Sequence, residues 1–236
     1  MRQIWTTLII PPFLFLFVII AASIYFGATL GVDGQAIADN VTQSTPYILL
    51  ITQILMLLLF IWALKSSRLT LSDMGWQIGA GQVLWQEILI GVVVGVVLVG
   101  LYFYFLSPMM IAAQHRFGDY VPPGELFSVL GTAVFPFFLA NVLLAPFVEE
   151  NIYRGMALTG LTPKYGIWGA ILISCIFFGL LHWSGGFWYM LLTGIVAGGS
   201  FAALFVWRGQ TVTPFVAHLL LNGIEFLVIW LRVSGQ

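Results

Sequence analysis

The chain has 236 residues, of which 61% are hydrophobic and 7% are Asp, Glu, Lys or Arg. Soluble domains carry about 25% charged residues, so this composition, with a mean hydropathy of +1.04, excludes an ordinary soluble domain and favours a polytopic membrane protein. The net charge of −1 offers no basic surface to nucleic acid, and a single cysteine, Cys175, excludes an internal disulfide.

Apolar runs long enough to cross a bilayer, about 20 residues each, recur along the chain. The first follows one charged residue, Arg2, and is longer than a signal-peptide core, with no A-x-A cleavage site after it, so we interpret it as a retained helix. The predicted fold is all-α, a transmembrane helical bundle of about seven spans, or eight if one re-entrant element is present. The expected spans are residues 8–28, 46–64, 87–107, 126–148, 166–183, 188–206 and 212–231.

The segments between these spans predict how the chain lies in the membrane. Residues 69–85 mix apolar and polar side chains, so we expect a surface-lying segment with Ser72 or Asp73 as a helix N-cap. Six of the eight Lys and Arg residues fall on the side of the N-terminus, which predicts a cytoplasmic N-terminus by the positive-inside rule. His115, on the other side, is interpreted as a solvated loop residue. No linker or repeat interrupts the chain, so we expect one integral-membrane domain over 1–236.

Two pairs of glycines predict where helices approach closely. Gly91 and Gly95 are separated by three residues, as are Gly194 and Gly198. Helices in lipid associate through close backbone packing, which pairs of small residues permit. We expect both pairs to mediate packing within this chain rather than dimerisation.

A charged stretch, PFVEENIYRG at residues 146–155, closes the fourth expected span. A charge at the centre of a membrane helix costs roughly 2.5–3.5 kcal/mol on insertion scales, so it is normally retained for a reason. Neighbouring helical residues point about 100° apart, and Glu150 lies four residues before Arg154, the spacing of an ion pair. Glu149 therefore faces elsewhere, without an evident partner. The alternative is that both glutamates merely mark a helix end at the membrane surface.

Four more polar residues lie in the last expected spans. His182 ends the fifth span, where it is also compatible with an ordinary interfacial histidine. His218, Asn222 and Glu225 follow Pro214 with helical spacing, so they share one stripe of an apolar helix. Such a stripe must face the protein interior rather than lipid.

A carboxylate and two imidazoles are suited to activating water. Glu149, His182 and His218 could act as a general base with hydrogen-bond partners, or together as three ligands of a zinc ion. An Asn222 amide and an imidazole N–H are suitable donors for an oxyanion. Neither H-E-x-x-H nor G-x-S-x-G occurs. The pattern therefore predicts hydrolysis of an acyl bond.

Three motifs in order resemble those of the CPBP intramembrane proteases, a family that includes type II CAAX prenyl endopeptidases and bacteriocin-processing or immunity proteins. The motifs are Glu149-Glu150-x-x-x-Arg154, Phe178-x-x-x-His182 and His218-x-x-x-Asn222. The resemblance covers the motif-bearing half, about residues 126–231, and implies a cavity that is open towards one membrane face.

The resemblance also implies roles for these residues. Glu149 would polarise water together with His182, His218 and Asn222 would stabilise the oxyanion, and Arg154 would hold Glu150. Phe178 belongs to the second motif and is expected in support. Whether a zinc ion takes part, or a glutamate alone activates the water, stays open. Glu225 lies outside the motifs; it would orient Asn222 or a histidine, or pair with a polar group of another helix.

We therefore expect an intramembrane endopeptidase that acts near the membrane face on a membrane-associated peptide or protein, whether lipidated or not. Its other partner is the lipid bilayer, and nucleic acid is not expected. One alternative is a non-proteolytic scaffold or immunity protein of the same fold. Another is a transporter or proton relay, although no inverted repeat supports it.

Overall fold

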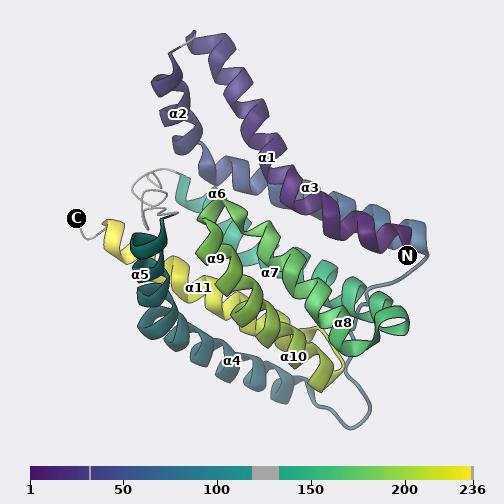
Figure 1. Ribbon diagram of the computed structural model, residues 1–236. Coiled ribbons are helices and arrows are strands. Elements are labelled where there is room, and N and C mark those ends of the chain that lie inside the picture. The colour runs from purple at the N-terminus through teal and green to yellow at the C-terminus, as the bar shows by residue number, and fades with distance from the viewer. Residues whose placement is uncertain (32, 119–132, 235–236) are drawn as a thin grey trace.

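The structure is a computed structural model that describes residues 1–31, 33–118 and 133–234. Within these ranges every regular element is helical and no strand occurs, which confirms the predicted all-α bundle (Figure 1). The first elements are α1 (Arg2–Leu30), α2 (Gly34–Gln43), α3 (Thr45–Ser67), α4 (Leu84–Leu101), the π-helical η1 (Tyr102–Leu106) and α5 (Ser107–Phe117). The later ones are α6 (Val134–Phe138), the π-helical η3 (Leu139–Leu144), α7 (Ala145–Glu149), the π-helical η4 (Glu150–Met156), α8 (Ala157–Leu181), η5 (Trp183–Gly185), α9 (Phe187–Leu192), the π-helical η6 (Thr193–Gly198), α10 (Gly199–Arg208) and α11 (Val212–Ser234).

Helices that are long and apolar enough to cross a membrane recur along the described part of the chain. Where the structure describes them, the seven expected spans all lie in helices, while residues 126–132 fall outside the described ranges. Among the described residues, α11 contributes the apolar stretch Val212–Val228. Five stretches are long and apolar enough to cross a membrane: Arg2–Leu30, Thr45–Ser67, Leu84–Phe117, Val134–Leu181 and Phe187–Arg208.

The stretch Val134–Leu181 holds two of the expected spans, joined by a reversal of the chain. Gly166 has φ 69° and ψ 169°, a conformation that glycine adopts without strain. The Ser174 hydroxyl donates to the Tyr153 carbonyl at 2.7 Å. Because these residues are 21 apart in sequence, the two arms form a helical hairpin whose turn includes Gly166.

The two adjacent glutamates lie inside a helix rather than at its end. The fourth span was expected to stop at residue 148, but the helix continues from α7 through η4 into α8. Gly166 of the hairpin turn lies 17 residues after Glu149, about 25 Å of helix at 1.5 Å per residue. The alternative that these carboxylates mark a helix end at the membrane surface is therefore wrong.

The segment between α3 and α4 is irregular and partly buried, so the expected surface helix is absent there. Asp73 caps a turn instead: its carboxylate accepts from the Thr70 hydroxyl and backbone N–H, both at 2.7 Å. The Thr70 hydroxyl and N–H hold the pKa of Asp73 below its usual value. Met74 is buried, and its carbonyl accepts from the Thr211 hydroxyl. The sequence contains too few apolar residues at helical spacing here to hold a helix against the bundle.

Two other local expectations differ from the structure. The loop after the first span contains α2, which begins at Gly34 because the Asp33 carboxylate accepts from the N–H groups of Gln35 and Ala36 at 3.0 and 3.3 Å. His115 is exposed, as expected, but it lies in the last turn of α5 rather than in a loop.

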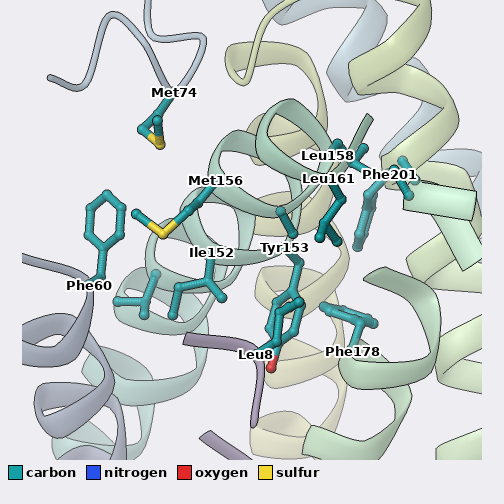
Figure 2. Close-up of a cluster of buried hydrophobic side chains, with 14 of the residues drawn as sticks. Leu8, Phe60, Met74, Ile152, Tyr153, Met156, Leu158, Leu161, Phe178 and Phe201 are labelled. Carbon is teal, nitrogen blue, oxygen red and sulfur yellow. The ribbon is translucent and has the colours of Figure 1, made fainter. Parts of the chain in front are cut away.

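The hydrophobic core centres on η4 and the start of α8. Figure 2 shows Ile152, Tyr153 and Met156 of this segment among side chains from other helices. Leu8 reaches it from α1 and Phe60 from α3, while Phe178 and Phe201 close the opposite side. The segment that carries Glu150 and Arg154 is therefore embedded in the hydrophobic core.

The first glycine pair fixes the contact between α4 and α11. A Cβ on Gly91 would lie 2.7 Å from the Thr213 carbonyl oxygen, and a Cβ on Gly95 would lie 2.9 Å from that of Ala217. Gly194 packs in the same way, where a Cβ would lie 2.9 Å from the Cys175 carbonyl oxygen. Both pairs thus act within this chain, as expected.

A buried carboxylate at the start of α4 also holds these helices together. Glu87 accepts from Nε of Arg208 at 2.9 Å and from the Thr213 hydroxyl at 2.7 Å. Gln210 donates to the same carboxylate at 2.8 Å. Sequence analysis did not single out this cluster, because its four members lie at the ends of three separate segments.

The α4–α11 contact generates a prediction with a control in the same helix. Gly95→Ala should destabilise the protein, because the added methyl group meets the backbone of α11. Gly100→Ala should be neutral or stabilising by up to about 1 kcal/mol, because nothing lies within 4 Å of a Cβ there. Thermal unfolding in detergent compares the two. Equal melting temperatures would contradict the close contact.

Candidate active site

The two glutamates at the α7–η4 junction point to different partners, as their helical spacing predicted. Both are buried, with Glu149 3% and Glu150 0% exposed. Glu150 accepts from Arg154 at 3.1 Å and lies 2.8 Å from Nδ1 of His218. Glu149 accepts from Nε2 of Gln53 on α3 at 3.3 Å, and its Oε2 has no partner among the described residues. Glu150 is thus charge-paired, whereas the only described side-chain partner of Glu149 is a neutral amide.

Arg154 is held by three kinds of contact within the bundle. Besides its ion pair with Glu150, its guanidinium donates to the Gly198 carbonyl at 3.1 Å. The same group lies 4.3 Å from the centre of the Phe178 ring and 5.3 Å from that of Phe201. Cation–π contacts of this kind are strongest where water is excluded. The guanidinium therefore links η4, α8, η6 and α10, and the predicted Glu150–Arg154 pair is confirmed.

His218 is oriented by Glu150, whereas sequence analysis grouped it with Glu149. Its ring stacks on Phe201, with ring centres 4.6 Å apart and an interplanar angle of 20°. The hydrogen bond at Nδ1 fixes the ring, and His218 lines the cavity described below. A carboxylate that orients an imidazole through one nitrogen leaves the other nitrogen for chemistry.

His182 follows α8 directly and has one defined tautomer. Its Nδ1 lies 2.8 Å from the Phe178 carbonyl oxygen. A carbonyl only accepts, so Nδ1 carries the proton and, in the neutral ring, Nε2 is an acceptor. The Phe178 ring packs 4.9 Å from the imidazole. The second motif thus contributes both the backbone and the ring that orient His182.

The polar stripe of α11 faces the interior, as predicted, but its members have different partners. Asn222 donates through Nδ2 to the Asn141 carbonyl at 2.8 Å, so one amide hydrogen remains. Glu225 forms a hydrogen bond with Tyr102 of η1. Of the two roles considered for Glu225, pairing with another helix is the one that the structure contains.

A cavity of about 70 Å³ lies between these helices. Most of its wall is apolar, and its polar groups belong to α8, α9, η6, α11 and η1. Glu149 and Glu150 do not belong to its lining; they are buried beside it. At roughly 10–15 Å³ of such volume per water molecule, the cavity has room for a few waters. Its polar lining residues are Tyr102, His182, Tyr189, Thr193, His218, Asn222 and Glu225.

The residues expected to hold a metal do not form a recognisable metal site. Among the described residues, no group of three His, Cys, Asp or Glu side chains is arranged to hold a metal ion. The Nδ1 atoms of His182 and His218 are taken by Phe178 and Glu150, and a zinc ion would need both remaining nitrogens together with Glu149. Zinc therefore stays a prediction, and we derive no step through a metal.

Sequence analysis missed three contributors to the site. Gln53 lies in an expected span that otherwise contributes no site residue, and its polarity there was the available signal. Tyr102 and Tyr189 belong to aromatic-rich stretches that resemble ordinary membrane helix, so nothing marked them. The π-helical form of η1, η4 and η6 was also not predicted. Such turns often occur at functional sites, and here each of the three contributes residues that line the cavity or hold its polar groups.

Comparison with known proteins points to the same family as the three motifs. Residues 131–224 match a family model described as type II CAAX prenyl endopeptidase Rce1-like. This match supports the assignment to the CAAX protease family that the three motifs indicated. At the level of the family, it supports an integral-membrane protease of the CAAX type. Neither the curated proteins nor the solved structures that were compared contain a match to this chain.

The buried ion pair predicts a structural rather than a chemical defect when Arg154 is lost. Arg154→Met should strand Glu150 without its counter-charge and destabilise the protein by roughly 3–5 kcal/mol. Thermal unfolding and folded yield in detergent measure this effect. Lys65→Met is the control, because Lys65 is exposed near the end of α3. A stable but inactive Arg154→Met protein would instead show that Arg154 takes part in the chemistry.

Proposed function

We propose that this protein is an intramembrane endopeptidase in which Glu149 activates a water molecule to hydrolyse a peptide bond. The observation that carries the proposal is that residues of the second and third motifs line one cavity inside the bundle, with the glutamates of the first motif buried beside it. Glu149 ends α7 beside this cavity, while His182, His218 and Asn222 line it. The family match independently supports a protease.

The unpaired groups are suited to orienting water. Glu149 keeps a buried, partnerless Oε2, and neutral His182 offers its Nε2 as an acceptor. The two residues also interact electrostatically. A water molecule that donates one hydrogen to each would present a lone pair to a peptide carbonyl. Glu150 also has a buried Oε2 without a partner among the described residues, but its Oε1 is bound by Arg154 and His218, so we assign the base to Glu149.

Asn222 and His218, which also line the cavity, supply hydrogen-bond donors for the negative charge that develops on the carbonyl oxygen of the substrate. Asn222 retains one amide hydrogen beyond its bond to Asn141. His218 donates from Nδ1 to Glu150, and its imidazolium form would also donate from Nε2. Preorganised donors in a site shielded from water contribute strongly to the stabilisation of an oxyanion.

The reaction then balances in two steps. Glu149 takes one proton as the water oxygen attacks the carbonyl carbon, and the carbonyl oxygen becomes an oxyanion near Asn222 and His218. The C–N bond breaks as the oxyanion collapses, and the proton on Glu149 passes to the leaving nitrogen. The products are a carboxylic acid and an amine, and the carboxylate of Glu149 is regenerated.

The substrate that we propose is a membrane-associated peptide or protein. Most of the cavity wall is apolar, with Leu98, Leu106 and Met110 on the α4–α5 side, and this wall suits an aliphatic segment. A prenylated CAAX segment is the form that the family description suggests.

We also propose a cytoplasmic N-terminus. The N-terminus, the end of α3, the α8 hairpin and the end of α10 all gather at one end of the bundle (Figure 1). Lys65, Arg68, Lys164 and Arg208 belong to these segments, so one end carries most of the positive charge, as the positive-inside rule requires of the cytoplasmic side.

The proposal predicts that Glu149→Gln abolishes cleavage without unfolding the protein. Loss of a general base lowers turnover by roughly 10²–10⁴-fold, while the amide keeps the shape of the side chain. We would measure cleavage of internally quenched peptides that end in Cys-aliphatic-aliphatic-Met, with and without a farnesyl group. Asp39→Asn, at an exposed carboxylate on α2, serves as the control.

The same variant identifies natural substrates. Protein N-termini in source cells that are lost only with Glu149→Gln would establish a protease and name its targets. Cleavage at the wild-type rate by Glu149→Gln would sink the mechanism. A cellular phenotype that this variant still rescues, with no N-termini lost, would favour the non-proteolytic scaffold.

A further inference from the structure

We propose that Gln53 is a positioning residue for Glu149, supplied by the N-terminal helices rather than by the motif-bearing half. The inference rests on the proposed function, because it concerns how the base is held. Gln53 lies at residue 53, far outside the matched segment 131–224, and none of the three motifs includes it.

Gln53 occupies an unusual place for an amide side chain. It lies on the face of α3 that packs against the bundle, between the buried residues Ile48 and Met56. The side chain is 8% exposed. A buried amide is costly unless it makes hydrogen bonds, and in this apolar stripe a leucine would pack as well. The contact that distinguishes Gln53 from a leucine is its bond to Glu149.

The bond holds one oxygen of the base and leaves the other available. Nε2 of Gln53 donates to Oε1 of Glu149 at 3.3 Å. Oε2 of Glu149 and Oε1 of Gln53 are both buried, and neither has a partner among the described residues. Buried acceptors of this kind are usually satisfied by ordered water. The amide thus orients the carboxylate and helps to create the place that a water fills.

The choice of a neutral donor matters because the two glutamates need opposite properties. Glu150 is bound by a guanidinium, which pairs its charge. Glu149 is held by an amide, which fixes its direction without cancelling its charge, so it remains a base. The other groups that interact electrostatically with Glu149 are Tyr153 of η4, His182 after α8 and Tyr189 of α9.

An amide also suits both states of the base. While Glu149 is ionised, the NH₂ group of Gln53 donates to it. After Glu149 has taken a proton from water, the carbonyl oxygen of Gln53 can accept that proton in a hydrogen bond. The same side chain therefore remains a partner throughout the catalytic cycle, which neither an arginine nor a leucine could do.

The test replaces the amide with an apolar side chain of similar size. Gln53→Met should lower kcat by about tenfold to hundredfold, the usual effect of losing a hydrogen bond to a charged group. KM for the quenched CAAX peptide should stay within about twofold, because Gln53 does not line the cavity. Thr52→Val is the matched control: Thr52 is equally buried, but its hydroxyl donates only to the Ile48 carbonyl of its own helix, at 2.8 Å.

A second variant keeps the inference testable if Gln53→Met fails to fold. Gln53→Glu has the same shape and replaces the donor with an oxygen. While this new carboxyl group is protonated it can still donate to Glu149, but two ionised carboxylates at this distance repel. We expect kcat of Gln53→Glu, relative to wild type, to fall from pH 6 to pH 8.

The outcomes separate this inference from the proposed function. If Glu149→Gln is inactive and Gln53→Met keeps the kcat of Thr52→Val, the inference is overturned and the proposed function stands. A pH profile of Gln53→Glu parallel to that of wild type would overturn it as well. If Glu149→Gln cleaves normally, the proposed function itself fails. A lower kcat at unchanged KM and melting temperature supports the positioning role.

Discussion

The buried network of Arg154, Glu150 and His218 is the interaction on which the rest of the structure depends. An unpaired charge in an apolar bundle would cost several kcal/mol, so each partner requires the others. The network joins η4 to α11 directly and reaches η6 through the Gly198 carbonyl. These three segments come from distant parts of the sequence. Because Arg154 and Glu150 neutralise each other, the adjacent Glu149 is not part of this ion pair.

The proposed chemistry depends on a difference in surroundings between the adjacent residues Glu149 and Glu150. Consecutive helical positions point about 100° apart, so two adjacent glutamates cannot share one environment. Glu150 meets a guanidinium and an imidazole, whereas Glu149 meets a neutral amide, and each keeps one oxygen without a partner among the described residues. In the proposed mechanism, the helix places a structural carboxylate and a reactive one at adjacent positions, which keeps the reactive group rigid.

Much of this arrangement could be predicted from the sequence, because charge is so scarce in the chain. A polar residue inside an apolar run is costly and is normally retained for a structural or functional role. On this ground the sequence pointed to Glu149, Arg154, His182 and Asn222 as candidate site residues. The same logic predicted the Glu150–Arg154 pair, and the glycine spacing predicted the close helix contacts. These features depend on spacing within one helix, which the sequence states directly.

What the sequence could not predict depends on how separate helices meet. The bond from Gln53 to Glu149 joins residues 96 positions apart, and the bond from Glu150 to His218 joins residues 68 apart. No local pattern encodes either contact. The helix that continues past Glu150 was missed because a charged pair after an apolar run is also the usual mark of a membrane surface. The π-helical turns depend on tertiary packing and leave no simple trace in composition.

The pairing of α4 with α11 has a mechanical consequence. Near its start, α4 is fastened to α11 by Glu87 and by the glycines at 91 and 95, where the backbones touch. Further along, the cavity lies between the two helices, and a hydrogen bond between Tyr102 and Glu225 links them at its wall. The contact between the two helices is therefore tight near the start of α4 and looser towards its end, where the cavity lies. Deformation should concentrate at η1 and α5, so a bulky chain from the lipid would meet the least resistance on that side.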